Sequence, residues 1–486
     1  MLKVYSRMEV DCTESGVAKD EKSPPKLVPD SKVVQRFSPI KRQLFVTSAS
    51  LVCAISGGMV VGFSAIFFPQ INANKEFNFT ADDESWIASM AALPMAPGCI
   101  LIGIIMETLG RKAANIIVSI PFTVGWILVY FANGFVMLLL GRFLQGISLG
   151  MTGPLNSVYI GETTDPLHRG YLLGGVSFGY TLGILTTHIL GTYIPWRATA
   201  IICGAINILS FIVFIFSPES PSYLLSKNKV DAAYKAFCWL RGYEEKATNE
   251  FQSMVLNHKL KSENEKGSFT ENICQPEFYK PLTVLMTMFF VLQFVGVNVV
   301  AFYTVSLMRD TLGGALDEFH AMILMDVVRF VMTVIVCILI KNVKRRPLFL
   351  VSGYGTAVCM ILLAIFCYIS NKYITEHFSF LPIIFFMGYI CFTSLGLLPL
   401  PWCLVGELFP LKSRGLGSGI TTGVNFVFFF LAVKIAPFMF EALALEGTFL
   451  FYGLVALIGT FVLSLILPET KNKTLQEIEN EFRKNN

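Results

Sequence analysis

Long apolar runs recur about every 25–35 residues along most of this 486-residue chain. Hydrophobic residues make up 54% of the chain and charged residues 15%, whereas soluble globular chains have roughly 45–50% and about 25%. Because about 20 apolar residues in a helix cross the ~30 Å hydrocarbon core of a bilayer, the pattern predicts an all-α polytopic membrane protein. The net charge is only +4, and no basic stripe is interleaved with aromatic residues, so no nucleic-acid partner is expected.

Twelve of these runs are predicted to be transmembrane helices. They cover residues 44–69, 86–106, 114–133, 137–160, 171–193, 198–216, 281–305, 319–340, 347–369, 381–405, 416–440 and 448–467. The chain therefore divides into a tail (1–43), six spans (44–216), a polar linker (217–280), six further spans (281–467) and a second tail (468–486). Within the linker, apolar residues at helical spacing predict a helix over residues 230–241 that stops at Gly242.

Lysine and arginine residues set the expected orientation of the spans, because cytoplasmic loops carry an excess of them. With both tails inside, the short inner loops carry nine Lys and Arg residues and the outer segments carry four. We therefore predict a multi-pass protein of the plasma membrane with both termini in the cytoplasm. Asn78, in Asn78-Phe79-Thr80 of the first outer loop, is then a candidate glycosylation site.

Three motifs follow equivalent spans in the two halves, in the same order. They are Arg111-Lys112 and Arg345-Arg346 (234 residues apart), Glu162 with Arg169-Gly170 and Glu407 with Arg414-Gly415 (245 apart), and Pro218-Glu219-Ser220 and Pro468-Glu469-Thr470 (250 apart). Such ordered self-similarity indicates a duplicated unit. Two parallel six-span bundles that hold a solute at their interface are the architecture of a rocking transporter.

Charged residues near the span ends are candidates for gating. We expect salt bridges between the halves to hold the cytoplasmic side shut and to break when the protein opens inward. The candidates are Glu107, Arg111, Arg142, Glu162, Arg169, Glu219, Glu407, Arg414 and Glu469.

Several motifs together resemble the sugar porter family of the major facilitator superfamily, over roughly residues 44 to 480. They are Gly141-Arg142, Tyr159-Ile-Gly-Glu162, Pro218-Glu-Ser-Pro221, Gln293-x-x-Gly296-x-Asn298, Pro399-x-Pro401-Trp402, Gly406-Glu407 and Pro468-Glu-Thr470. The segments Gly58–Ser64 and Glu84-Ser-Trp86 are similar to those of the insect facilitated trehalose transporters. The resemblance implies twelve helices in two pseudo-symmetric bundles, and helices in the linker that brace the cytoplasmic gate.

The resemblance also implies a set of sugar contacts. Gln293 and Asn298 would offer amide donors and acceptors to a hydroxyl-rich solute, although buried amides can also join helices. Trp402 would stack on a sugar face, with a packing role as the alternative. Asn425 matches another amide position, and Ser177 stands where the family has a glutamine.

The chain departs from the family pattern at several of the predicted sugar-contact positions. The paired glutamines become Leu292-Gln293, and Arg329 occupies an asparagine position. Asp326 lies one turn before Arg329, on the same helix face. Two hypotheses stay open: the two residues neutralise each other, or Arg329 contacts an acidic solute.

Proton-driven relatives carry an aspartate in the first span after glycine and an aromatic residue, where this chain has Gly62-Phe63-Ser64. Because serine does not titrate near neutral pH, we predict facilitated diffusion (uniport) of a sugar such as trehalose or a hexose. Asp326 is the residue that could reverse this prediction.

A non-transporting sensor with the same fold, or a carrier of a non-sugar or anionic solute, is the alternative. The solute and the lipid bilayer are the expected partners, and we expect a monomer. The 11 cysteines and five histidines have no spacing typical of a metal site or a catalytic triad, so we predict no metal, no cofactor and no enzymatic activity.

Overall fold

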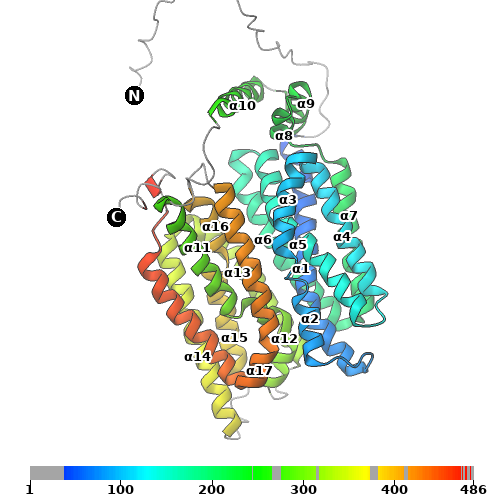
Figure 1. Ribbon diagram of the computed structural model, residues 1–486, viewed down its shortest axis with the longest axis vertical. Coiled ribbons are helices and arrows are strands. Elements are labelled where there is room, and N and C mark those ends of the chain that lie inside the picture. The colour runs from blue at the N-terminus through cyan, green and yellow to red at the C-terminus, as the bar shows by residue number, and fades with distance from the viewer. Residues whose placement is uncertain are drawn as a thin grey trace, which may run out of the picture.

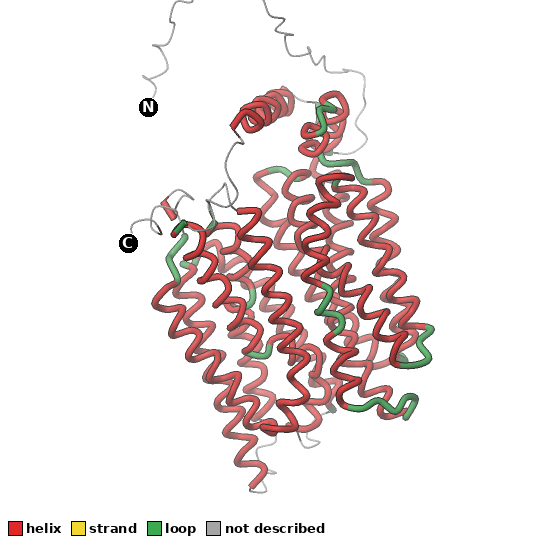
Figure 2. Tube along the Cα trace, viewed as in Figure 1, coloured by secondary structure: helices red, strands yellow, loops and turns green. Residues whose placement is uncertain are grey.

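The computed structural model describes residues 38–243, 245–264, 275–312, 317–372, 381–409, 414–471, 473, 477–478 and 482. Helices make up nearly all of this part of the chain, in which no strand occurs, and short loops connect them (Figure 2). The predicted all-α class is confirmed.

The N-terminal half is a bundle of α1 (Pro39–Asn74), α2 (Ala81–Ser89), α3 (Met95–Leu109), α4 (Arg111–Tyr130), α5 (Phe135–Thr163), α6 (Pro166–Tyr193) and α7 (Trp196–Phe216). It occupies the right of Figure 1. Apolar side chains such as Ile100, Ile104 and Phe216 remain exposed on its outside, as expected for a surface in contact with lipid.

The C-terminal half contains α11 (Pro276–Phe294), α12 (Val297–Leu312), α13 (Glu318–Asn342), α14 (Arg345–Lys372), α15 (Leu381–Phe392), the π-helical turn η2 (Thr393–Leu397), α16 (Pro399–Leu408) and α17 (Arg414–Ile466). It occupies the left of Figure 1. The two halves touch where α1 packs on α12, α2 and α3 on α17, and α6 on α13.

The linker forms α8 (Pro221–Ser226), α9 (Val230–Arg241) and α10 (Glu245–Asn264), which lie at one end of the bundle (Figure 1). We call this end the linker end, and the opposite one the far end. As predicted, α9 buries Phe237 and Leu240 and stops at Gly242. It is tied to the N-terminal half, since Arg42 donates to the Trp239 carbonyl at 2.8 Å.

Ten helices of the described chain are long and apolar enough to cross a membrane. The predicted span 86–106 is split into α2 and α3, of which α3 alone is only 15 residues long. The 53 residues of α17 would extend ~80 Å as one rod, but its backbone is non-helical at Ala444. There the chain reverses at the far end, from the orange to the red ribbon of Figure 1. If α2 and α3 together count as one span and α17 counts as two, the ten helices correspond to the twelve predicted spans. The number of spans remains a prediction.

Candidate functional site

A break in the seventh predicted span brings two polar side chains together. Helix α11 ends at Phe294, α12 begins at Val297, and Gly296 between them has a φ of 84°. A side chain at Gly296 would be strained by this left-handed backbone, and its Cβ would lie 2.8 Å from the ring of Tyr452. The sequence therefore needs glycine at the break.

The break allows Gln293 and Asn298 to meet, although residues five apart in an unbroken helix point about 140° apart. Asn298 Nδ2 donates to Gln293 Oε1 at 2.7 Å. Gln293 Nε2 then donates to Asn425 Oδ1 of α17, also at 2.7 Å. We call Gln293, Asn298 and Asn425 the amide trio. Gln293 and Asn425 are buried and Asn298 is half-buried.

The amide trio retains hydrogen-bonding capacity beyond its two internal bonds. Each amide has two N–H donors and a carbonyl oxygen with two lone pairs. The internal bonds leave the Asn298 carbonyl and the Asn425 NH₂ group unused within the trio. A vicinal diol, which both donates and accepts, matches these groups.

Trp402 of α16 lies beside the amide trio. Its indole is 5.1 Å from the ring of Phe289, one turn before Gln293, and 6.4 Å from that of Phe426, next to Asn425. Trp402 remains 44% exposed although it is held on the two phenylalanines. An indole that is packed on one side and exposed on the other can stack on an apolar sugar face.

Ser177 and Arg329 are not joined to the amide trio by a hydrogen bond in the described structure. Ser177 is exposed on α6, where the neighbouring Phe178 packs against Phe330 of α13 at 4.6 Å. Arg329 donates to Asp326 Oδ1 at 3.0 Å, which agrees with the hypothesis of a mutually neutralised pair.

Arg142 lies away from the charged residues at the linker end, about 30 Å along α5 from Glu162. Its role in gating stays a prediction. Its guanidinium is buried and donates to the Val60 carbonyl at 2.8 Å, to Gln145 at 3.1 Å and to the Ser64 hydroxyl at 2.7 Å. Arg142 thus fastens α5 to α1 inside the N-terminal half.

The charged residues at the linker end of the N-terminal half form one network. The Glu219 carboxylate accepts from the backbone N–H groups of Arg111 at 2.9 Å and Lys112 at 3.1 Å, the first residues of α4. Arg111 pairs with Glu162 at 2.9 Å, and Ser220 donates to the other oxygen of Glu162. An anion is favourable at a helix N-terminus, so Glu219 caps α4.

The C-terminal half repeats this network. Glu469 accepts from the backbone N–H groups of Arg345 at 3.0 Å and Arg346 at 3.1 Å, at the start of α14. Arg345 pairs with Glu407 at 3.2 Å, and Thr470 donates to the other oxygen of Glu407 at 2.6 Å. Burial alone would raise the pKa of the Glu469 carboxyl, but its backbone hydrogen bonds hold that pKa below its usual range.

Each network lies inside one half, and the bridges expected between the halves when the cytoplasmic side is shut stay a prediction. Within the part of the chain that the structure describes, Glu162 and Glu407 are paired with arginines of their own repeat. Glu107 is exposed at the end of α3, and Arg169 is half-buried. Arg414 begins α17, but its side chain lies outside the described residues.

Contacts between the halves are found at the far end. Lys434 of α17 pairs with Asp82 of α2 at 2.6 Å, and its ammonium lies 4.2 Å from the ring centre of Trp86. Ser85 donates to the Lys434 carbonyl at 2.9 Å. The halves are therefore joined on the side away from the linker.

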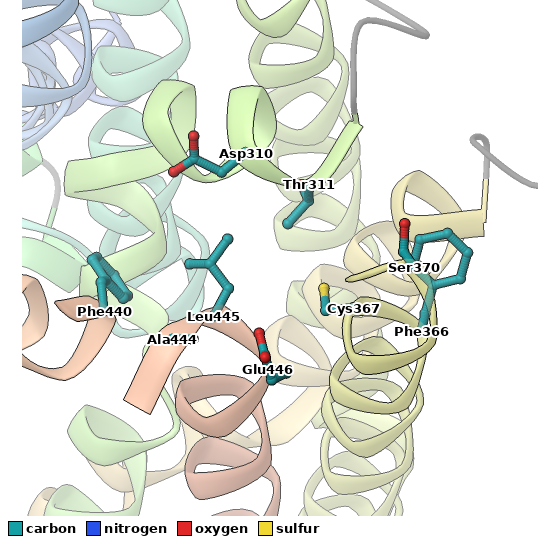
Figure 3. Close-up of a pocket in the computed structure, with 9 residues that line it drawn as sticks. All are labelled: Asp310, Thr311, Phe366, Cys367, Ser370, Phe440, Ala444, Leu445 and Glu446. Atoms are coloured by element: carbon teal, nitrogen blue, oxygen red, sulfur yellow. The ribbon is translucent and has the colours of Figure 1, made fainter. Parts of the chain in front are cut away.

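A hollow of about 270 Å³ opens at the far end of the C-terminal half, between the ends of α12 and α14 and the reversal in α17 (Figure 3). Asp310, Cys367 and Glu446 are among its lining residues. None of the predicted sugar contacts lines this hollow, so it is separate from the amide trio.

Comparison with known families decides the class of protein. The family model described as "Sugar (and other) transporter" matches residues 46–482. The chain belongs to this sugar transporter family. The resemblance drawn from the motifs is confirmed, and so is the prediction that the protein is a membrane transporter rather than an enzyme.

Relatives of this sugar transporter include facilitated trehalose transporters named Tret1. The one from Polypedilum vanderplanki is 31% identical over 456 residues, which cover 92% of this chain and 90% of that protein. The one from Bombyx mori is 30% identical over 427 residues, covering 87% and 84%. The Aedes aegypti protein is longer, and the match covers 56% of it at 31% identity.

Solved structures show the same fold. A partially occluded inward-open conformation of the xylose transporter XylE from E. coli has a TM-score of 0.74 at 18% identity, covering 89% of this chain and 100% of that one. An inward-open conformation of XylE has a TM-score of 0.73 at 19% identity, covering 91% and 99%. The two-bundle major facilitator fold is thereby confirmed.

Sequence reasoning missed one polar residue of this transporter. His188 of α6 is fully buried and contacts Asp326 across the interface between the halves. Its spacing from the other histidines indicated no site. The available signal was its position, because an ionisable residue inside an apolar span is costly and usually functional.

Proposed function

We propose that this protein is a facilitative transporter that moves a sugar, such as trehalose or a hexose, across the plasma membrane by alternating access. The observation that carries the proposal is the amide trio at the break of the seventh span. Discontinuous helices near the bilayer midplane commonly form the solute site of such carriers. Trp402 beside the trio adds an aromatic surface, and amides with an aromatic ring suit a sugar.

Uniport follows from the surroundings of Arg142. Its partners are the neutral Ser64 hydroxyl and backbone or amide oxygens, whereas the proton-driven relatives carry an aspartate at the position of Ser64. Without that carboxyl group, Arg142 and Ser64 include no acid that could carry a proton with each sugar. We therefore expect sugar to flow down its own gradient.

The orientation that we propose puts the linker end and both tails in the cytoplasm and the far end outside. The contacts of Lys434 with Asp82 and Ser85 then close the outer side, so this conformation faces inward. The two matching networks, around Glu162 and around Glu407, would stiffen each half as it rocks as a unit. We expect the monomer to be the working unit, because each chain has its own pair of halves.

A substrate panel tests the proposal. Purified protein in liposomes should take up at least one of trehalose, glucose, other hexoses or polyols faster than empty liposomes, with no ion gradient. Uptake of only sugar acids or other anions would favour a carrier that uses Arg329. Binding of a sugar without any flux would favour a sensor.

Glycosylation tests the orientation separately. Asn78 is exposed in the loop before α2. In eukaryotic cells, Asn78→Gln should increase gel mobility because it removes an N-glycan, and glycosidase treatment of the unaltered protein should produce the same band. The matched control is Asn472→Gln, because Asn472-Lys473-Thr474 in the C-terminal tail is also a glycosylation sequence but is expected to lie in the cytoplasm. A mobility change with Asn472→Gln instead would place that tail outside.

A further inference from the structure

A buried histidine and a buried aspartate face each other across the two halves. His188 of α6 is 0% exposed, and Asp326 of α13 is 4% exposed. The Nδ1 atom of His188 contacts Asp326 Oδ2. The other ring nitrogen, Nε2, lies 3.0 Å from the carbonyl oxygen of Gly62 on α1. A Cβ at Gly62 would come within 3.2 Å of Nε2, so glycine allows this close approach.

Both ring nitrogens of His188 therefore face groups that accept hydrogen bonds. A neutral imidazole has one N–H group and one bare lone pair. If Nε2 donates to Gly62, a bare Nδ1 would oppose a bare carboxylate oxygen of Asp326. If Nδ1 donates instead, a bare Nε2 would oppose the Gly62 carbonyl. Neither arrangement satisfies the buried groups, which costs free energy.

One additional proton removes this conflict. A doubly protonated His188 donates to both Gly62 and Asp326, and a protonated Asp326 donating to Nδ1 leaves Nε2–H for Gly62. In both cases the pair holds one proton more than a neutral imidazole with a carboxylate. Closing the contact between His188 and Asp326 therefore requires that the pair bind one proton.

Two arginines lie next to this contact. Arg329 donates to the other oxygen of Asp326 at 3.0 Å, and Arg142 donates to Ser64, two residues after Gly62. Among the described residues, further titratable groups in this region are Tyr180 of α6 and Tyr389 of α15, both near Arg329, and Cys203 of α7, beside Thr187. Histidine changes its charge between about pH 5 and 8.

The contact lies in the outer part of the interface. His188 is five residues before the outer end of α6, and Asp326 is eight residues after the outer start of α13. When the outer side opens, the two halves part there. Asp326 then keeps Arg329, its partner on the same helix, and His188 needs only one N–H group for Gly62. His188 in the open state therefore binds the extra proton less tightly than in the closed state.

We propose that His188 and Asp326 are a proton-binding site that latches the outer gate, so that one proton is taken up when the gate closes and released to the same side when it opens. This inference relies on the proposed alternating access, but not on the identity of the sugar. Because the proton binds the closed state more tightly than the open state, low pH shifts the carrier toward the inward-facing conformation. Protons thus regulate the carrier and are not its cargo.

The expected effect is a pH-dependent affinity on the outer side. A solute that binds only outward-facing molecules has its apparent affinity reduced by the fraction that faces outward. Couplings between sites typically change affinity about 5- to 150-fold. With equal pH on both sides, we expect the sugar concentration for half-maximal influx to rise about tenfold between pH 8 and pH 5.5.

His188→Gln is the decisive variant, because glutamine can still donate to Asp326 but does not titrate. Its half-saturating sugar concentration should not change with pH. The matched control is His168→Gln, since His168 lies on the same helix, α6, but is exposed at its linker end, away from the outer gate. This control should keep the pH profile of the unaltered protein. Asp326→Asn is a second test, because its amide can donate to a neutral His188 without an extra proton.

A second measurement makes the outcome independent of sugar transport. Hydrogen–deuterium exchange of the outer ends of α6 and α13, corrected for the intrinsic effect of pH, should be slower at pH 5.5 than at pH 8. This difference should disappear in His188→Gln and persist in His168→Gln. An unchanged difference in His188→Gln, or none in the unaltered protein, overturns the latch. If an imposed pH gradient drives sugar accumulation, the proton is not released to the side from which it came, and uniport is contradicted. The hydrogen–deuterium exchange result still decides, separately, whether the proton site exists.

Discussion

Replacing Gln293 by leucine is expected to lower the initial rate of sugar influx about a hundredfold at low sugar concentration. Leucine has a similar size but leaves the Nδ2 group of Asn298 and the Oδ1 atom of Asn425 without their 2.7 Å partner. Asn298 and Asn425 are then no longer held in place for the sugar, and a buried sugar hydroxyl left unsatisfied costs about 1–3 kcal/mol. A loss of about 3 kcal/mol corresponds to roughly a hundredfold in rate. The rate should be measured in liposomes and divided by the amount of folded protein.

Thr283→Val is the control for this substitution. Thr283 is exposed on the same helix, and its hydroxyl donates to the Tyr279 carbonyl of the preceding turn at 2.9 Å. It should leave influx within about twofold, because surface substitutions have small effects. If Gln293→Leu lowers only the thermal stability and leaves influx per folded molecule unchanged, the amide trio joins helices and does not bind the solute.

Replacing both Glu219 and Glu469 by glutamine is expected to give the largest loss of stability. Each carboxylate accepts from two first-turn N–H groups, those of α4 and those of α14. Hydrogen bonds to a charged group contribute about 1.5–3 kcal/mol, which solvent screening at these partly exposed positions reduces to about 1–2 kcal/mol each. The two sites share no partner, so the effects of the single substitutions should add.

Thermal unfolding in detergent measures these effects, with Glu107→Gln as the control because Glu107 is exposed at the end of α3. Acid should remove the contribution of Glu469 in the unaltered protein. Since its pKa is lowered in the folded state, this contribution is complete above the unfolded-state pKa of about 4.3 and is lost as the pH falls through the lowered value. Unequal losses, with one substitution neutral, would contradict the equivalence of the two networks.

The repeat of the two halves could be read from the sequence, and the structure extends it to single hydrogen bonds. The motifs around Glu219 and Glu469 repeat because each one caps the helix that begins with the corresponding arginine motif. The helix over residues 230–241 was predictable for the same kind of reason, because its apolar spacing and Gly242 are local signals.

Long-range contacts were not predictable in this way. The partners of Arg142 on α1, Val60 and Ser64, lie 82 and 78 positions before it. The contact of His188 with Asp326 joins residues 138 positions apart, and no spacing rule relates them. The meeting of Gln293 and Asn298 depends on the direction of the chain after Gly296, which only the three-dimensional structure gives.

Counterflow is the measurement that tests alternating access most directly. Liposomes loaded with unlabelled sugar and diluted into a trace of labelled sugar should accumulate the label transiently above its outside concentration, with no ion gradient and equal pH on both sides. In a carrier whose site faces one side at a time, unlabelled sugar inside competes with the label for the inward-facing site, so the label enters faster than it leaves. If no sugar or polyol of the panel gives this overshoot while one of them binds, the protein does not transport that solute, and alternating access is contradicted.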